Sequence, residues 1–87
     1  MVQKEKLLKS YEAHKKSIDL WFKNFCLEPT PYGKIQYACE CISVIGESTM
    51  ISLILEKDYD INLEQERKYM LKVRLFLEKY FRQIGGC

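Results

Sequence analysis

The stretch from Gly33 to Lys57, GKIQYACECISVIGESTMISLILEK, decides how this chain folds. Taken as a helix with 100° per residue, it is apolar on two opposite sides. A helix that is apolar nearly all round is expected to be buried nearly all round. The first face comprises Ile35, Ala38, Cys39, Ile42, Ile45, Thr49, Met50 and Leu53, and the second comprises Tyr37, Cys41, Val44, Ser48, Ile51 and Leu55.

The second face has the heptad spacing of a helix-packing seam. Two other helices would either sandwich the central helix from both sides, or both pack on the first face and leave the second open. An exposed apolar stripe of that kind is typical of a contact site. We favour the open stripe, and therefore predict a self-association interface at Tyr37, Cys41, Val44, Ser48, Ile51 and Leu55.

Two features of this stretch allow other interpretations. The β-branched residues of 42–44 and 49–55 would also suit strands, but the absence of turn residues between them favours one continuous helix. Gly46 lies on the first face, where a glycine costs a helix about 1 kcal/mol relative to alanine. Close approach of a neighbouring helix would explain Gly46, and a kink or a hinge would be alternatives.

Amphipathic helices are predicted on both sides of the central one. Apolar residues recur every three or four positions from Leu7 to Phe25, and Pro29 and Pro31 then break the helix. A second periodic pattern follows the central helix up to Ile84. We expect helices at about 2–26, 31–57 and 62–84 and a loose tail at 85–87, forming one small all-α domain, an antiparallel three-helix bundle that is oligomeric.

Composition limits the protein classes that fit. The chain has 87 residues, 47% of them hydrophobic, with only four glycines and two prolines, which favours long helices over short strands. A domain of this size is marginally stable alone, so oligomerisation would help it. The N-terminus lacks the apolar core of a signal peptide, and no apolar run approaches the ~20 residues of a membrane span. We therefore expect a cytoplasmic protein that does not contact a membrane.

The cysteines and the single histidine do not form a recognisable reactive site. Cys39 and Cys41 point roughly 200° apart on a helix, so they cannot hold one metal ion together. With Cys26 they are expected to be small core residues, whereas Cys87 is expected to be a free thiol. His14 lies in the apolar stripe of the first helix and is expected to be structural. We predict no catalytic residue, no metal and no cofactor.

Basic residues of the third helix are the candidate contacts for an anion or a nucleic acid. The isoelectric point near 8.3 is low for a nucleic-acid-binding domain, and no helix-turn-helix, zinc or RNA-binding signature is present. Nucleic-acid binding is therefore considered but not favoured. The candidate residues are Arg67, Lys68, Lys72, Arg74 and Lys79.

Together these patterns predict a non-catalytic interaction protein, such as an adaptor, an inhibitor or a regulatory subunit. It would act as a homo-oligomer and through contacts with another protein. One alternative is a nucleic-acid-binding regulator that uses the basic third helix. A second alternative is a protein that binds a small anionic ligand in a pocket at a subunit interface.

Overall fold

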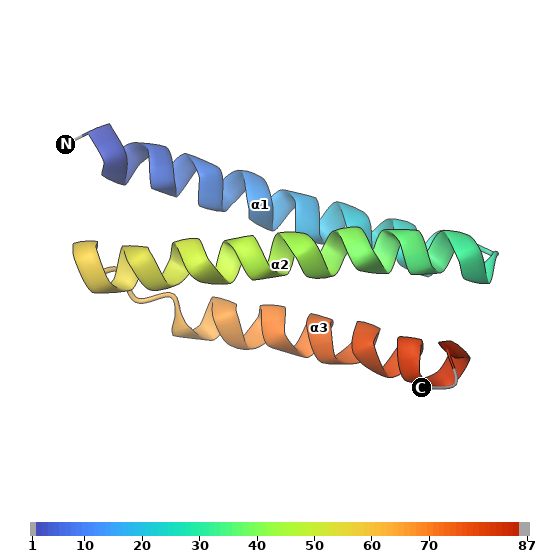
Figure 1. The fold of residues 1–87 in the computed structure, drawn as a ribbon. Helices are drawn as coiled ribbons and strands as arrows, with labels where there is room; N and C mark the ends of the chain where they lie inside the picture. Colours follow the sequence, from blue (N-terminus) through green and yellow to red (C-terminus); the bar gives the residue numbers. More distant parts are fainter. Residues whose placement is uncertain (1, 86–87) are drawn as a thin grey trace.

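The computed structural model describes residues 2–85, which form three α-helices. The chain runs along one helix, returns along the second, and runs forward again along the third, with the second helix in the middle (Figure 1). The part of the chain described holds no strand, which confirms the predicted all-α bundle and removes the strand alternative. The helices are α1 (Val2–Leu27), α2 (Pro31–Tyr59) and α3 (Glu64–Gly85).

The break between α1 and α2 follows from local chemistry around Thr30. Thr30 has an extended backbone and its hydroxyl oxygen accepts a hydrogen bond from the Gly33 N–H at 3.1 Å. The same hydroxyl donates to the Glu28 carboxylate at 2.7 Å. Pro31 occupies the first helical position, where its missing N–H has no cost. α2 therefore starts at the predicted residue.

The turn between α2 and α3 is organised by Glu56. Asp60 ends α2 in the left-handed conformation, with φ of 57°, and its N–H donates to the Glu56 carbonyl at 3.2 Å. The Glu56 carboxylate accepts a hydrogen bond from the Leu63 N–H at 2.8 Å. Asn62 then caps α3 by accepting from the Glu64 N–H at 3.1 Å. α3 starts two residues later than predicted because Asn62 serves as its cap. Gly85, which was predicted to belong to the loose tail, is instead the last residue of α3. The other two predicted tail residues, 86–87, lie outside the described part of the chain.

The core lies along the inward side of α2. Tyr11, Ile18 and Phe25 of α1 reach it at seven-residue intervals, as a helix-packing stripe should. Leu63, before α3, and Met70, Val73 and Leu77 of α3 cover it from the other side. We call the buried residues of α2 the inner seam: Ala38, Cys41, Ile45, Ser48, Ser52 and Leu55.

Small side chains make up most of the inner seam. Ser48 and Ser52 are fully buried, yet their hydroxyls donate to carbonyls of α2 itself, to Val44 at 2.8 Å and to Thr49 at 2.7 Å. Their hydrogen-bonding needs are thus met without a partner from another helix. Small, satisfied side chains let α1 and α3 both approach α2 closely.

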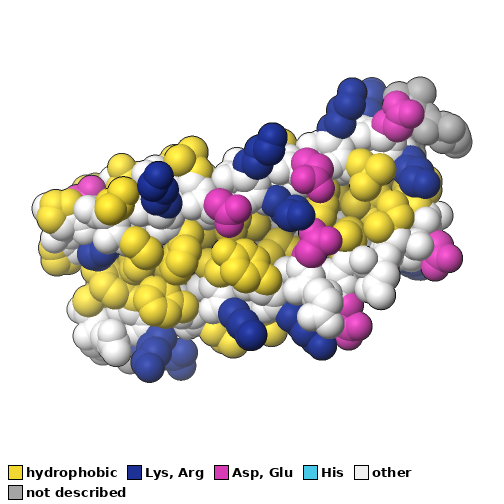
Figure 2. Space-filling view, turned by 180° about the vertical axis from the view of Figure 1, so that it is seen from behind, with side chains coloured by type: hydrophobic (Ala, Val, Ile, Leu, Met, Phe, Trp, Pro, Cys, Tyr) yellow, Lys and Arg dark blue, Asp and Glu magenta, His cyan; other side chains and the backbone are white. Residues whose placement is uncertain are grey.

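Aromatic side chains join α1 directly to α3. Phe22 lies edge-to-face with Phe76, with ring centres 5.7 Å apart, and Phe25 does the same with Tyr80 at 5.0 Å. Such edge-to-face pairs stabilise a contact beyond the apolar area they bury. Seen from behind, apolar side chains gather in a band along the middle of the molecule, with charged side chains along its edges (Figure 2).

Candidate interaction surface

The predicted self-association interface lies against α1 within the same chain. The Cys41 thiol is 3.7 Å from the Ile18 carbonyl oxygen, and the rings of Trp21 and Tyr37 are 5.8 Å apart. The prediction that this stripe stays open is therefore wrong, because α1 occupies it. Self-association itself stays a prediction. Cys41, Ser48 and Leu55 are fully buried, and Tyr37, Val44 and Ile51 are partly buried.

The first face of α2, by contrast, is only partly covered. Ala38 and Ile45 are buried, whereas Met50 is 66% exposed and Leu53 is 50% exposed. Apart from Met50, the residues on this side recur at alternating steps of four and three, which again is the spacing of a helix-packing seam. We call them the outer stripe: Ile35, Cys39, Ile42, Gly46, Thr49, Met50 and Leu53.

Gly46 lies at the middle of the outer stripe and is exposed. A Cβ atom added at this position would meet no atom within 4 Å. The prediction that a neighbouring helix approaches Gly46 closely is therefore wrong within the described chain. The fold itself gives no steric reason for a glycine in this helix interior.

The cysteines differ in exposure more than predicted. Only Cys41 is a core residue, while Cys26 and Cys39 are exposed. Burial raises the pKa of the Cys41 thiol to about 11. Cys39 points outward because it belongs to the outer stripe and Cys41, two residues later, to the inner seam. Cys87 lies outside the described residues.

α3 extends the apolar surface beside the outer stripe. A hollow of about 190 Å³ separates the two helices there, lined by Ile45, Thr49 and Leu71 together with two arginines. Leu71 and Leu75, one turn apart, are 52% and 49% exposed. We call the outer stripe together with Leu71 and Leu75 the outer face.

The apolar character of α2 is high for a helix at the surface. By length and composition alone α2 could cross a membrane, so the prediction that no apolar stretch approaches a membrane span does not hold for this helix. Only 33% of its most apolar stretch is buried in the structure. α2 therefore presents more apolar surface than α1 and α3 cover.

The basic residues named as candidate anion contacts fall into two groups. Arg67 pairs with Glu56 at 2.8 Å, and this ion pair lowers the pKa of the Glu56 carboxylate. Arg74 pairs with Glu78 at 3.2 Å. The remaining three are exposed and make no ion pair with the described residues: Lys68, Lys72 and Lys79.

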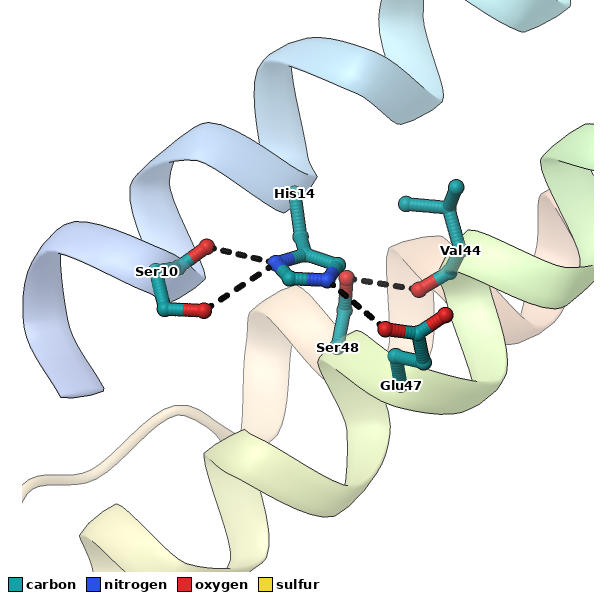
Figure 3. Close-up of polar contacts among 5 residues, drawn as sticks. All are labelled: Ser10, His14, Val44, Glu47 and Ser48. Carbon is teal, nitrogen blue, oxygen red and sulfur yellow. Dashed lines mark hydrogen bonds and ion pairs between the residues drawn. The ribbon is translucent and has the colours of Figure 1, made fainter.

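His14 lies between α1 and the edge of α2 (Figure 3). Its Nδ1 is 2.6 Å from the Ser10 carbonyl oxygen, and its Nε2 is 3.1 Å from the Glu47 carboxylate. The contact with the Ser10 carbonyl, reinforced by Glu47, raises the pKa of His14 above its ordinary value. Both ring nitrogens thus lie beside hydrogen-bond acceptors, and this arrangement orients the imidazole and favours its protonated form.

A cavity of about 230 Å³ lies between α1 and α3. Tyr11 donates to the Glu66 carboxylate at 3.0 Å, and Lys15 pairs with the same group at 2.7 Å. Tyr69 and Asp19, 3.4 Å apart, close another side of the cavity. Two carboxylates against one lysine make this cavity a poor match for an anion. The small-anion alternative gains no support from it.

The described residues contain no cluster of three or more His, Cys, Asp or Glu side chains that could hold a metal ion.

Comparison with known proteins gives no relative. The chain matches no known protein family and has no significant match among curated proteins or solved structures. The surface therefore has to be interpreted from its own geometry.

Sequence reasoning found the residues of the outer stripe but placed them inside the bundle. The signal that separates the two sides of α2 is side-chain size rather than apolarity. Ala38, Cys41, Ser48 and Ser52 form a row of small residues, which marks the side that packs between two helices. The larger Met50 and Leu53 lie on the side that the described helices cover only in part, and both are at least half exposed.

Proposed function

We propose that this protein is a non-catalytic interaction protein, an adaptor, inhibitor or regulatory subunit, that acts through the outer face. In this proposal the antiparallel three-helix bundle is a rigid support for the outer face. The single observation that carries the proposal is the half-exposed apolar side chains on two adjacent helices, with Met50, Leu53, Leu71 and Leu75 each about half exposed or more. Apolar patches of this kind are typical of protein–protein contact sites.

The experiment compares apolar-to-lysine substitutions on two different faces of the protein. Met50→Lys with Leu53→Lys places two charges on the outer face, whereas Leu20→Lys changes a side chain that is 56% exposed on α1. Tagged protein is immobilised and exposed to an extract of the cells that produce it, and bound proteins are identified by mass spectrometry. We expect the wild type and Leu20→Lys to capture the same defined proteins, including untagged copies, and the double variant to lose them.

The result that contradicts the proposal is equal capture by all three proteins. Circular dichroism and thermal unfolding of each variant check that the helices remain intact. Since both substituted positions are exposed, the fold should tolerate the lysines. A loss of capture without a loss of fold would then assign the interaction to the outer face.

A second candidate function is nucleic-acid binding through α3. The specific observation in its favour is that Lys68, Lys72 and Lys79 are exposed and make no ion pair with the described residues. Binding of this kind would weaken steeply with salt, because it depends on releasing counterions from the phosphates. Retention on DNA and RNA is measured from 50 to 300 mM salt with the wild type and with Lys72→Glu combined with Lys79→Glu. Salt-sensitive retention lost in the variant would support this function, and its absence in the wild type would exclude it.

A further inference from the structure

The outer stripe has the spacing of a helix-packing seam, but only one edge of it is covered: Thr49 lines the hollow beside Leu71 of α3, whereas Gly46, Met50 and Leu53 are exposed. Apart from Met50, its positions alternate in steps of four and three from Ile35 to Leu53, which suits a straight partner helix rather than a loop or a small molecule. The inner seam, centred roughly 110° around α2 from the outer stripe, holds the residues that α1 and α3 bury most deeply. A helix packed along the exposed part of the outer stripe would have to come from outside the described residues.

We infer that this partner is the outer stripe of a second copy, with the two α2 helices crossing antiparallel at Gly46. The inference rests on the proposed function, because it names the occupant of the same outer face. Gly46 is the residue that decides where the helices cross. No contact within one chain requires a glycine at this position, since an added Cβ would meet no atom within 4 Å. A glycine at a helix crossing instead lets two backbones approach closely.

Two-fold symmetry around Gly46 pairs residues that complement each other in size. In an antiparallel pair, positions equally far before and after the crossing point face each other across the interface. Cys39 lies seven residues before Gly46 and Leu53 seven residues after it, so a small side chain faces a large one. Ile42 and Met50, four residues before and after, would form a second facing pair in which both side chains are apolar.

The charge distribution also suits a copy of the same surface. A charge within the stripe would be buried against an identical chain without an opposite charge to pair with it. None of the seven positions from Ile35 to Leu53 that form the outer stripe is charged. The nearest acid at its centre, Glu47, is turned toward α1 by its 3.1 Å contact with His14.

The size of the outer face fits a modest dimer interface. Residues 35 to 53 rise about 27 Å along α2, and the bundle measures 19 by 16 Å across its axis. A face of this length and width offers about 500 Å² per copy, somewhat below the ~600–1,000 Å² that specific interfaces bury on each partner, so the dimer is expected to be weak. The solution mass should therefore be measured at tens to hundreds of micromolar protein.

The test uses cysteine cross-linking to read the geometry. In a chain with Cys26→Ser and Cys87→Ser, Leu53→Cys is added and the protein is oxidised mildly at 100 µM. We expect a disulfide between Cys39 of one copy and position 53 of the other, seen as a covalent dimer by mass spectrometry. The bond cannot form within one chain, because the two positions are about 21 Å apart along one helix. Leu20→Cys in the same background is the matched control, and should stay uncross-linked.

Each remaining outcome overturns a stated part of the inference. A Cys39–Cys39 disulfide in the background without Leu53→Cys would show parallel helices and overturn the antiparallel crossing. A monomeric mass by light scattering at 100 µM, with no cross-link, would overturn the second copy as the partner. Binding of that monomer to lipid vesicles, lost in Met50→Lys with Leu53→Lys, would assign the outer stripe to a membrane surface. The proposed function fails separately, if the capture experiment shows no difference between the outer-face and Leu20→Lys variants.

Discussion

The inner seam and the outer stripe of α2 both follow heptad spacing, yet α1 and α3 bury the inner seam completely and the outer stripe only in part. The inner seam is built mainly from small side chains, such as Ala38, Ser48 and Ser52. The outer stripe carries larger ones, such as Met50 and Leu53, around a single glycine. The difference teaches that spacing and apolarity predict which faces of a helix can pack against a neighbour. Side-chain size then decides how closely neighbouring helices approach that face and how many of them fit.

The largest expected effect comes from truncating one leucine on each side of α2. Leu55 is fully buried and Leu53 is 50% exposed, although only two residues separate them. Leu55→Ala should lower the free energy of unfolding by about 2–5 kcal/mol, because it removes buried methyl groups and leaves a cavity. Leu53→Ala should change it by less than about 0.5 kcal/mol in dilute protein, as exposed positions do. Urea unfolding at low micromolar concentration measures both, and equal losses would contradict the assignment of the two sides.

Cysteine labelling of the wild-type protein tests the same difference in burial between the two sides of α2. Burial raises the pKa of Cys41 from 9.0 to about 11, which lowers its thiolate fraction near pH 8 roughly a hundredfold. Cys39 is exposed on the outer stripe. In dilute protein, iodoacetamide should modify Cys39 at least about a hundred times faster than Cys41. Peptide mass spectrometry over a time course resolves the two sites. Similar rates in the folded protein, normalised to rates in urea, would show that Cys41 is not protected.

Much of this fold could be predicted from the sequence because helix signals are local. The proline after Thr30 and the apolar periodicity of each segment are visible in a short window, and they placed all three helices within two residues of their observed bounds. The side of α2 that faces the other helices is a property of the whole bundle. Both sides are apolar, so periodicity alone could not choose between them.

The candidate site was harder to predict for the same reason. Ser48 was placed on an open interface because helical phase assigns it to the second apolar face, but it lies in the core, where its hydroxyl donates to the Val44 carbonyl at 2.8 Å. Gly46 was expected to contact a helix of the same chain, and the described residues supply no such contact. The pairing of Arg67 with Glu56 depends on the turn between α2 and α3, which has no repeating pattern to read.

A smaller effect on the free energy of unfolding is expected from substitutions at the centre of the outer stripe. Gly46→Ala should raise the free energy of unfolding of the monomer by up to about 1 kcal/mol, because alanine favours helix and the added Cβ meets no neighbour. Gly46→Met should keep the monomer folded but weaken dimerisation, because a long side chain would hold the two helices apart. Thermal unfolding in dilute protein and light scattering at 100 µM separate these effects. Unchanged assembly in Gly46→Met would move the crossing point away from Gly46.

The smallest expected effect on stability concerns the ion pair at the edge where α1 meets α2. Among the described residues, His14 and Glu47 form the only ion pair between these helices. The Ser10 carbonyl and Glu47 raise the pKa of His14 in the folded chain above its unfolded value near 6.5. A raised pKa means that the folded state holds the proton more tightly, so the stabilisation is complete below pH 6.5 and is lost as pH rises through the folded pKa.

Unfolding of the wild type should therefore become easier between about pH 6 and 8, and His14→Gln should remove this dependence. Because Glu47 is 64% exposed, the contribution should stay within the ~0.2–1 kcal/mol of surface ion pairs and shrink with added salt. Glu47→Gln should reduce the slope only in part, because the Ser10 carbonyl still favours the charged ring. Urea unfolding at pH 6 and pH 8 measures the difference. A wild type that becomes more stable over this range would mean that burial, which favours the neutral imidazole, outweighs both acceptors.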